Sequence, residues 1–238
     1  MASPKTAPLG RDIFLSGAYV DYFRPDDEGN PFFKLYGQKR LETIHLINDI
    51  GKRKQILDLG GGSGRLAGCL DQSQDQDVVL ADLSVRMLKA SLMQSRGGRH
   101  LRVINADAHH LPFRDHSFDI VVGLDLFCHL EWPRKALGEF RRVLKDQGIL
   151  ILDSTNANPL WALFYPRYLG KNPSRWIKIM RYRGVYPGWE AIVKHYSRRQ
   201  FSSMLRDAGF RIIQGRNYGP RVCPKWHLVV AGKEAQAN

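Results

Sequence analysis

The hydrophobic residues of this chain alternate between two kinds of segment from about residue 36 onward. In the first kind, apolar residues recur every three or four positions, as Leu41, Ile44 and Ile47 do, and this spacing predicts a helix with one buried face. In the second kind they form short continuous runs such as Ile149–Leu152, which are typical of strands buried on both sides. The predicted helices span residues 36–50, 64–71, 85–95, 133–144 and 198–208, and the predicted strands span 55–59, 78–81, 101–104, 118–124, 148–152, 210–215 and 225–231.

Strands that alternate with helices predict an α/β fold, Rossmann-like, with a mostly parallel sheet covered by helices on both faces. The chain divides into an N-terminal aromatic segment and helix (1–54), a core (55–154), an insertion (155–196) and a C-terminal helix with the final strands (197–238). The insertion breaks the pattern, because it is rich in aromatic and basic side chains. Aromatic residues at this density predict an apolar pocket or a lid over a substrate.

Charge, apolar run length and cysteine spacing limit the classes of function that the chain could have. Lys and Arg number 36 against 23 Asp and Glu, and the net charge of +13 attracts anions such as nucleic acid, anionic lipid or an acidic small molecule. No apolar window reaches the ~18 residues of a membrane-spanning helix, and no leader pattern opens the chain, so we expect a cytoplasmic protein. The cysteines, Cys69, Cys128 and Cys223, lack metal-ligand spacing, so we expect no metal site.

A glycine-rich segment, Ile56–Gly64, lies where a predicted strand meets a predicted helix and reads ILDLGGGSG. Glycine permits a tight turn and lets a ligand approach the backbone closely. Residues 62–67 also fit the GxGxxA pattern of dinucleotide-binding proteins, and an NAD-dependent oxidoreductase is an alternative that rests on this match alone. Asp58, just before the glycines, opposes that alternative, because a carboxylate would repel a diphosphate but suits a ligand with an ammonium group.

Two further acids follow the next two strands. Asp82 ends the second predicted strand, where a carboxylate can accept hydrogen bonds from ribose hydroxyls. Asp107 follows the third strand and could accept a hydrogen bond from an adenine amino group. Because ligands in open α/β sheets bind at the carboxyl ends of the strands, we expect Asp58, Asp82 and Asp107 to line one cleft.

The segments LDLGGGSGRLA, VVLADLS, INADAHHLPF, SFDIVVGLDLFCHL and VLKDQGILIL, between Gln55 and Leu152, together resemble the core of class I methyltransferases that use S-adenosylmethionine (SAM). The overall resemblance is to the broad group of ubiquinone/menaquinone C-methyltransferases and small-molecule methyltransferases. It implies an enzyme with SAM as methyl donor, S-adenosylhomocysteine (SAH) as product, and seven strands with the last one antiparallel. This chain departs from the group in its three consecutive glycines, which we expect to be tolerated, and in lacking the quinone enzymes' own substrate signatures.

The resemblance also implies which residues contact SAM. They are Tyr22, Asp58, Gly60, Gly61, Gly62, Gly64, Asp82, Leu83, Asp107, Ala108, Leu124 and Asp125. Asp58 and the glycines would line the methionine part, Asp82 would hold the ribose hydroxyls, and Asp107 would flank the adenine. Leu124 and Asp125 would border the methionine end.

Two histidines are candidate general bases, which assist methyl transfer to an acidic O–H or C–H group. His129 lies five residues beyond the fourth predicted strand, and His195 lies just before the last predicted helix. We expect the acceptor to be a small hydrophobic molecule, methylated on an O or C atom, and the basic insertion is compatible with peripheral contact with an anionic membrane. The alternatives are an RNA methyltransferase, for which no RNA-binding module is visible, and a non-catalytic SAM-binding partner protein.

Overall fold

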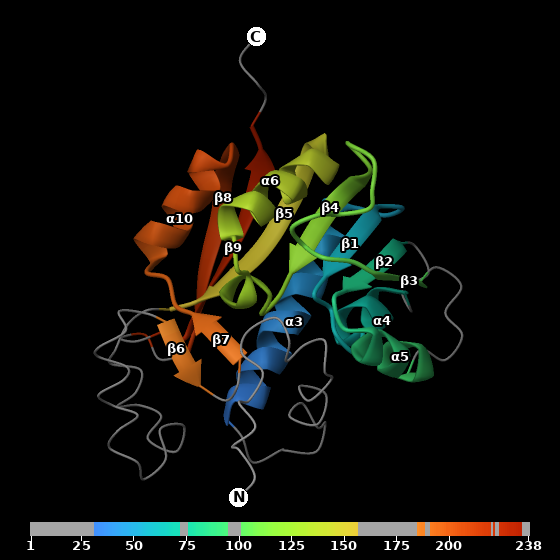
Figure 1. The fold of residues 1–238 in the computed structure, drawn as a ribbon. Helices are drawn as coiled ribbons and strands as arrows, with labels where there is room; N and C mark the ends of the chain where they lie inside the picture. Colours follow the sequence, from blue (N-terminus) through green and yellow to red (C-terminus); the bar gives the residue numbers. More distant parts are fainter. Residues whose placement is uncertain are drawn as a thin grey trace, which may run out of the picture.

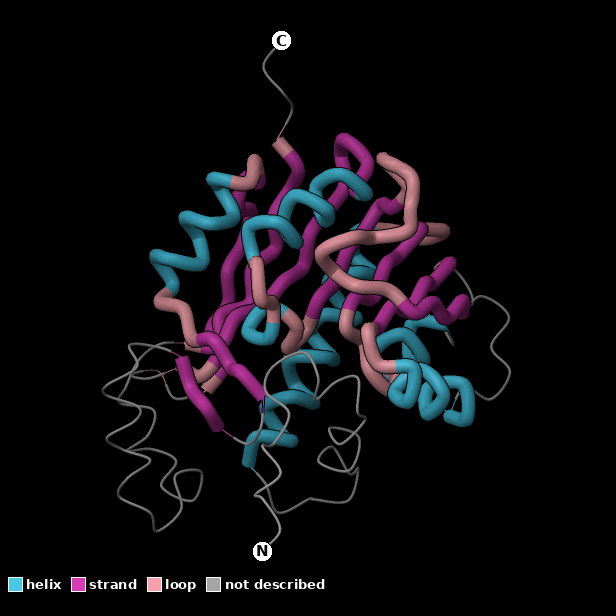
Figure 2. Tube along the Cα trace, viewed as in Figure 1, coloured by secondary structure: helices cyan, strands magenta, loops and turns pink. Residues whose placement is uncertain are grey.

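The computed structural model describes residues 31–71, 76–94, 101–156, 185–188, 191–219, 221 and 224–234. These residues form one seven-stranded sheet with helices packed on both faces, and a separate two-stranded hairpin (Figures 1 and 2). The strands of the sheet are β1 (Gln55–Leu59), β2 (Asp77–Asp82), β3 (Leu101–Asn105), β4 (Phe118–Gly123), β5 (Leu144–Thr155), β8 (Phe210–Tyr218) and β9 (Trp226–Lys233).

The strand order confirms the predicted fold class. It is β3-β2-β1-β4-β5-β9-β8, with the pairs from β3 to β5 parallel and β9 antiparallel to both of its neighbours. The last strand of the chain is therefore the antiparallel one, as the resemblance implied. The strand order changes direction between β1 and β4, and in open sheets of this kind a crevice forms at such a point, beyond the carboxyl ends of the strands.

Five helices of the described chain cover the sheet. Those on one face are α3 (Pro31–Ile50), α4 (Arg65–Asp71) and α5 (Val85–Gln94), and those on the other are α6 (Pro133–Val143) and α10 (Arg198–Asp207). Successive residues of a strand point to opposite faces, so Leu57 packs in the core under α6 and α10, whereas Ile56 packs in the core under α3, α4 and α5. By the same alternation, Asp58 points toward α3 and α4.

Ser197 is the N-cap of α10. Its side-chain oxygen accepts a hydrogen bond from the backbone N–H of Gln200 at 3.2 Å, and the Gln200 side chain accepts one from the backbone N–H of Ser197 at 2.9 Å. This reciprocal pair satisfies two N–H groups that the first turn of a helix leaves without partners.

Several helix and strand boundaries in the structure differ from those predicted from the sequence. The first helix begins at Pro31 rather than at residue 36, because proline is well accommodated in the first turn of a helix. The hairpin strands β6 (Val185–Gly188) and β7 (Ala191–Lys194) were not predicted at all. Pro187 argues against a strand, since proline cannot donate to a ladder, and each segment has only four residues in which a pattern could show.

Two other expectations from the sequence, on membrane spans and on the division of the chain, can be compared with the described residues. None of the described helices is both long and apolar enough to cross a membrane. Much of the segment at 155–196 and nearly all of the aromatic N-terminal segment lie outside the described residues. The four-part division of the chain stays a prediction.

Candidate active site

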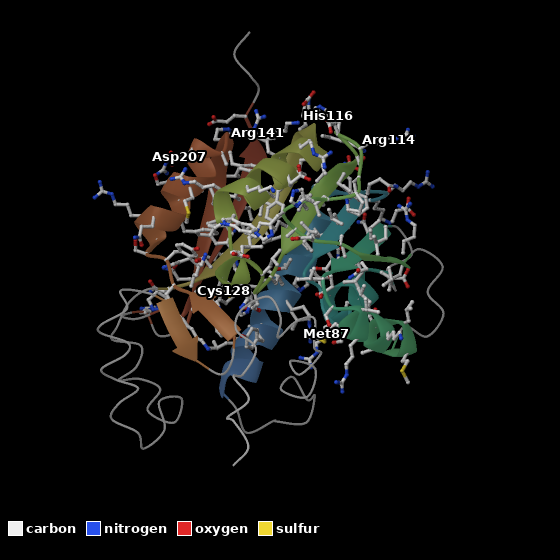
Figure 3. All side chains as sticks on the ribbon, viewed as in Figure 1. Met87, Arg114, His116, Cys128, Arg141 and Asp207 are labelled. Carbon is white, nitrogen blue, oxygen red and sulfur yellow. The ribbon has the colours of Figure 1, made fainter. Side chains whose placement is uncertain are left out.

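A cleft of about 280 Å³ opens beyond the carboxyl ends of β1, β2 and β4, near the lower end of the size range of small-molecule sites (~300–1,000 Å³). Figure 3 shows Met87 and Cys128 at this end of the sheet, and Arg114, His116, Arg141 and Asp207 at the opposite end. The sequence-predicted residues that line the cleft are Asp58, Gly60, Gly61, Gly62, Asp82, Leu83, Asp107, Ala108, Leu124, Asp125 and His129. The three acids that follow successive strands therefore face one cavity.

The glycine turn after β1 adopts a conformation that favours glycine. Gly60, Gly62 and Gly64 have φ angles of +66°, +55° and +78°, in the left-handed region where a side chain is strained. The turn is fastened to β2, because the N–H of Gly60 donates to the carbonyl of Ala81 at 2.7 Å. Gly64 has this geometry without being one of the described residues that line the cleft.

Gly61, the additional glycine of the run, is required for a different reason. Its φ is not in the left-handed region, but an added Cβ would lie 2.2 Å from Cδ1 of Leu80 and 2.5 Å from Oδ2 of Asp58. The space that a side chain would need is filled by a core leucine and by a carboxylate. The three consecutive glycines are thus explained by steric contact as well as by turn geometry.

Asp58 is buried without full hydrogen bonding. Its side chain lines the cleft, the residue is 2% exposed, and its Oδ2 has no hydrogen-bond partner among the described residues. Burial raises the pKa of Asp58 to about 7, a shift increased by the neighbouring Asp82 and opposed by a backbone hydrogen bond. A buried carboxylate oxygen without a donor is unfavourable unless a ligand supplies one.

Asp82 ties the loops of the cleft together. Its Oδ1 accepts the N–H of Ser84 at 2.8 Å and its Oδ2 accepts the N–H of Gly62 at 2.9 Å. Burial raises the pKa of Asp82, and these backbone hydrogen bonds oppose the shift. Asp82 therefore couples the end of β2 to the glycine turn while its carboxylate remains at the cleft.

Asp107 belongs to a short network after β3. Its Oδ1 accepts the N–H of His109 at 3.0 Å and lies 2.7 Å from the Nδ1 atom of the same residue. The Nε2 atom of His109 accepts the N–H of Trp132 at 3.2 Å, which requires the tautomer with its proton on Nδ1. This network links the loop after β3 to the segment between β4 and α6.

The two candidate bases have different surroundings. His129 ends the short 3₁₀ helix η1 (Phe127–His129) and lines the cleft. His195 is not one of the described residues that line it, and its Nδ1 lies 3.2 Å from the carbonyl oxygen of Asn156. Burial lowers the pKa of His195 to about 4, so its ring is neutral at pH 7. Tyr22, which was predicted to contact SAM, lies outside the described residues. The catalytic roles of His129 and His195 and the cofactor-binding roles of the other residues stay predictions.

Sequence reasoning missed the charged residues that α3 brings to the cleft. Arg40 lines it together with Arg65, and the Nε of Arg40 is buried with no hydrogen-bond partner among the described residues. Burial, and then the nearby charge of Arg40, lowers the pKa of Arg65. Two guanidinium groups this close create a positive wall beside the glycine turn. No local motif marks Arg40, because only the packing of α3 against α4 brings it there.

The remaining chemistry of the described residues is limited. They hold no group of three or more His, Cys, Asp or Glu side chains that could bind a metal ion. Burial raises the pKa of the Cys128 thiol to about 12, which leaves it protonated and unreactive at neutral pH. The site offers carboxylates, two guanidinium groups, two lysines, two histidines and backbone N–H groups around a concave surface.

Known proteins resemble this chain in sequence. Residues 57–152 match the family model described as a methyltransferase domain. The chain is 33% identical over 182 residues to a demethylmenaquinone methyltransferase of Clavibacter sepedonicus, covering 75% of this chain and 74% of that protein. It is 30% identical over 198 residues to a ubiquinone/menaquinone biosynthesis C-methyltransferase of Francisella tularensis subsp. novicida, covering 76% and 77%.

A solved structure shows the same fold. Magnesium protoporphyrin IX methyltransferase from Synechocystis, crystallised with bound SAH, superposes with a TM-score of 0.70 at 20% identity, covering 94% of this chain and 98% of that one. Fold, site and sequence relatives agree on the class of protein. The chain belongs to the class I SAM-dependent methyltransferases of the quinone C-methyltransferase type.

Replacing Gly61 tests the steric account of the glycine run. Gly61→Ala should destabilise the protein by about 1–3 kcal/mol, because the new methyl group overlaps Leu80 and Asp58. Gly68→Ala in α4 is the matched control: nothing lies within 4 Å of its added Cβ, so it should be neutral or stabilising by about 0.5–1 kcal/mol. Urea unfolding measures both variants, and equal effects would contradict the account.

Asp58→Asn tests whether the buried charge is costly. Folding raises the pKa of Asp58 from 3.8 to about 7, so the wild-type protein loses stability as pH rises through this window. The variant lacks the charge and should be more stable than wild type at pH 8 by about 1–3 kcal/mol. The difference should disappear near pH 4. A variant destabilised equally at both pH values would show that the charge is not costly.

Proposed function

We propose that the cleft binds SAM with its methionine part at the glycine turn and its adenosine part beyond β2 and β3. The observation that carries this proposal is that two residues of the same cleft, Asp58 and Arg40, each have a buried polar atom, Oδ2 and Nε, with no hydrogen-bond partner among the described residues. An amino acid with free ammonium and carboxylate groups satisfies both, since the carboxylate of Asp58 accepts from an ammonium and a guanidinium donates to a carboxylate. The membership in a SAM-dependent family supports the same ligand.

The nucleoside end of SAM would lie along the next two strand ends. Asp82 would accept from the ribose hydroxyls, with Leu83 and Met87 packing nearby, and Asp107 with Ala108 would flank the adenine. Asp82 keeps acceptor capacity for this purpose, because a carboxylate offers about four lone-pair sites and three are occupied by the backbone N–H groups of Gly62, Ser84 and Leu83.

SAM supplies a methyl group that is already activated by a sulfonium centre. The protein's residues therefore have to orient the acceptor and keep water out of the cleft, and orientation contributes up to ~7–11 kcal/mol in favourable cases. Lys194 of the β6–β7 hairpin lines the cleft and donates to the carbonyl of Glu131 at 2.7 Å. This contact supports a substrate-covering role for the segment at 155–196.

The acceptor is proposed to be a small hydrophobic molecule, methylated on an O or C atom. Leu126 and Leu130 give an apolar lining to the cleft that His129 also lines, and His129 would take a proton from the acceptor. The relatives named as quinone methyltransferases support an aromatic acceptor of the quinone type.

Calorimetry with SAM, SAH and NAD tests the donor. We expect SAM and SAH to bind and NAD not to bind. Arg40→Leu should weaken SAM binding about tenfold or more, because it removes a charge-assisted donor from the methionine carboxylate. Leu41→Ala, at the exposed neighbouring position of α3, should leave the affinity unchanged. Binding of NAD without SAM or SAH would overturn the proposal.

His129→Gln tests the general base. We expect the rate of methyl transfer from labelled SAM to a panel of hydroxylated naphthoquinones and phenols to fall about 10²-fold or more, with SAM affinity unchanged. His110→Gln, at an exposed histidine outside the cleft lining, is the control. Full activity of His129→Gln together with an inactive His195→Gln would assign the proton transfer to His195 instead.

A further inference from the structure

A buried lysine lies at the wall of the cleft without belonging to any predicted site. Lys39 of α3 is 1% exposed, and its Nζ lies 2.8 Å from each carboxylate oxygen of Asp125. The same Nζ donates to the carboxylate of Asp153, and it lies 4.9 Å and 4.7 Å from the ring centroids of Tyr36 and Trp226. Two carboxylates and two aromatic rings surround the ammonium group.

Asp153 holds the backbone of the same turn. It lies in β5, is 1% exposed, and its Oδ1 accepts the N–H of Asp125 at 2.6 Å. Asp125 has a φ of +57°, a left-handed conformation that is unfavourable for a residue with a side chain. Contacts to both its N–H and its carboxylate keep Asp125 in this conformation, and therefore set the direction of its side chain.

The cluster of Lys39, Asp125 and Asp153 carries one positive and two negative charges. Burial alone would lower the pKa of Lys39, but the charges of Asp125 and Asp153 raise it overall, so the amine stays protonated. Burial raises the pKa of Asp153 to about 6, against the effect of Lys39, so it is ionised at pH 8. Asp125, whose side chain is 24% exposed, lines the cleft. The buried Lys225 also interacts electrostatically with Asp125 and Lys39, and burial lowers the pKa of Lys225 well below its ordinary value.

The anchored turn also covers the glycines. Leu126, the residue after Asp125, packs so closely on Gly60 that a Cβ there would lie 2.9 Å from its Cδ1. A shift of Asp125 would therefore move the side chain that covers the glycine turn. One buried cluster thus controls both a charged group and an apolar contact at the same end of the cleft.

We propose that Lys39 and Asp153 are positioning residues that hold the carboxylate of Asp125 against the cleft, where it recognises the cationic methionine end of SAM. This inference rests on the proposed function. Because the carboxylate is already held in place, SAM binding does not incur the entropy cost of ordering a mobile side chain. The carboxylate of Asp125 favours a positively charged ligand at this position.

The test replaces the anchor while preserving the charge. Lys39→Met/Asp153→Val removes one positive and one negative group, and apolar replacement of a buried ion pair is often tolerated by the fold. We expect the dissociation constant of SAM, measured by calorimetry at pH 8, to rise about tenfold or more. Asp125→Asn should weaken binding in the wild-type background and have little further effect in the double variant, because the anchor acts through Asp125.

The control is a more exposed lysine–aspartate pair near the amino ends of β4 and β5, at the opposite end of the strands from the cleft. Lys145 lies 2.9 Å from Asp119, which accepts the N–H of Gln55 at 2.9 Å, as Asp153 accepts that of Asp125. Lys145→Met/Asp119→Val should leave SAM affinity unchanged. Thermal melting identifies any variant that is not folded, and Asp153→Asn takes the place of the double variant if that one is unfolded.

The outcomes separate the two proposals. Wild-type protein that binds neither SAM nor SAH would refute the proposed function. Wild-type binding of SAM, with unchanged affinity in Lys39→Met/Asp153→Val or an equal effect of Asp125→Asn in both backgrounds, would overturn only the positioning role. A loss of melting temperature without a change in SAM affinity would assign the cluster a purely structural role and overturn the inference.

Discussion

The carboxylate of Asp58 is the constraint around which the cleft is arranged. It is carried into the interior at the end of a central strand, with one oxygen that no described residue satisfies. Its presence removes the space for a side chain at Gly61, so the acid and the glycine run depend on each other. The molecule keeps an unfavourable buried charge at this position, as proteins do at sites where function requires it.

The other charges of the cleft are arranged by the same sheet edge. Parallel strands bring Asp82 and the loop of Asp107 beside Asp58, because their carboxyl ends meet at one rim. The face of the sheet that carries α3 adds positive groups, with Arg40 near the glycine turn and Lys39 beneath Asp125. Acidic groups from strand ends and basic groups from α3 and α4 thus give the cavity both negative and positive walls, which suit a ligand that carries both charges.

The class of reaction and the identity of the acceptor rest on different parts of the molecule. The proposed cofactor end is made from strand ends and their turns, which follow from the sheet topology. The proposed acceptor end involves η1 and the β6–β7 hairpin, and relatives at 30–33% identity support the class of reaction more firmly than the identity of the acceptor. The methyl group of SAM is already activated by the sulfonium, so the protein mainly has to orient the acceptor. The same SAM-binding fold can therefore serve different acceptors.

The sequence by itself determined the fold class, the sheet rim and the cofactor family. These rest on local signals: buried apolar runs, glycines at a turn, and acids at the ends of strands, such as Asp58 and Asp82. Only the tertiary structure decided that Arg40 and Lys39 belong to the site, that His195 does not line the described cleft, and that Gly61 is required by contact with Leu80. The physical reason is distance along the chain: Lys39 meets residues 86 and 114 positions away, and no local pattern encodes contacts between a helix face and strand ends so far apart.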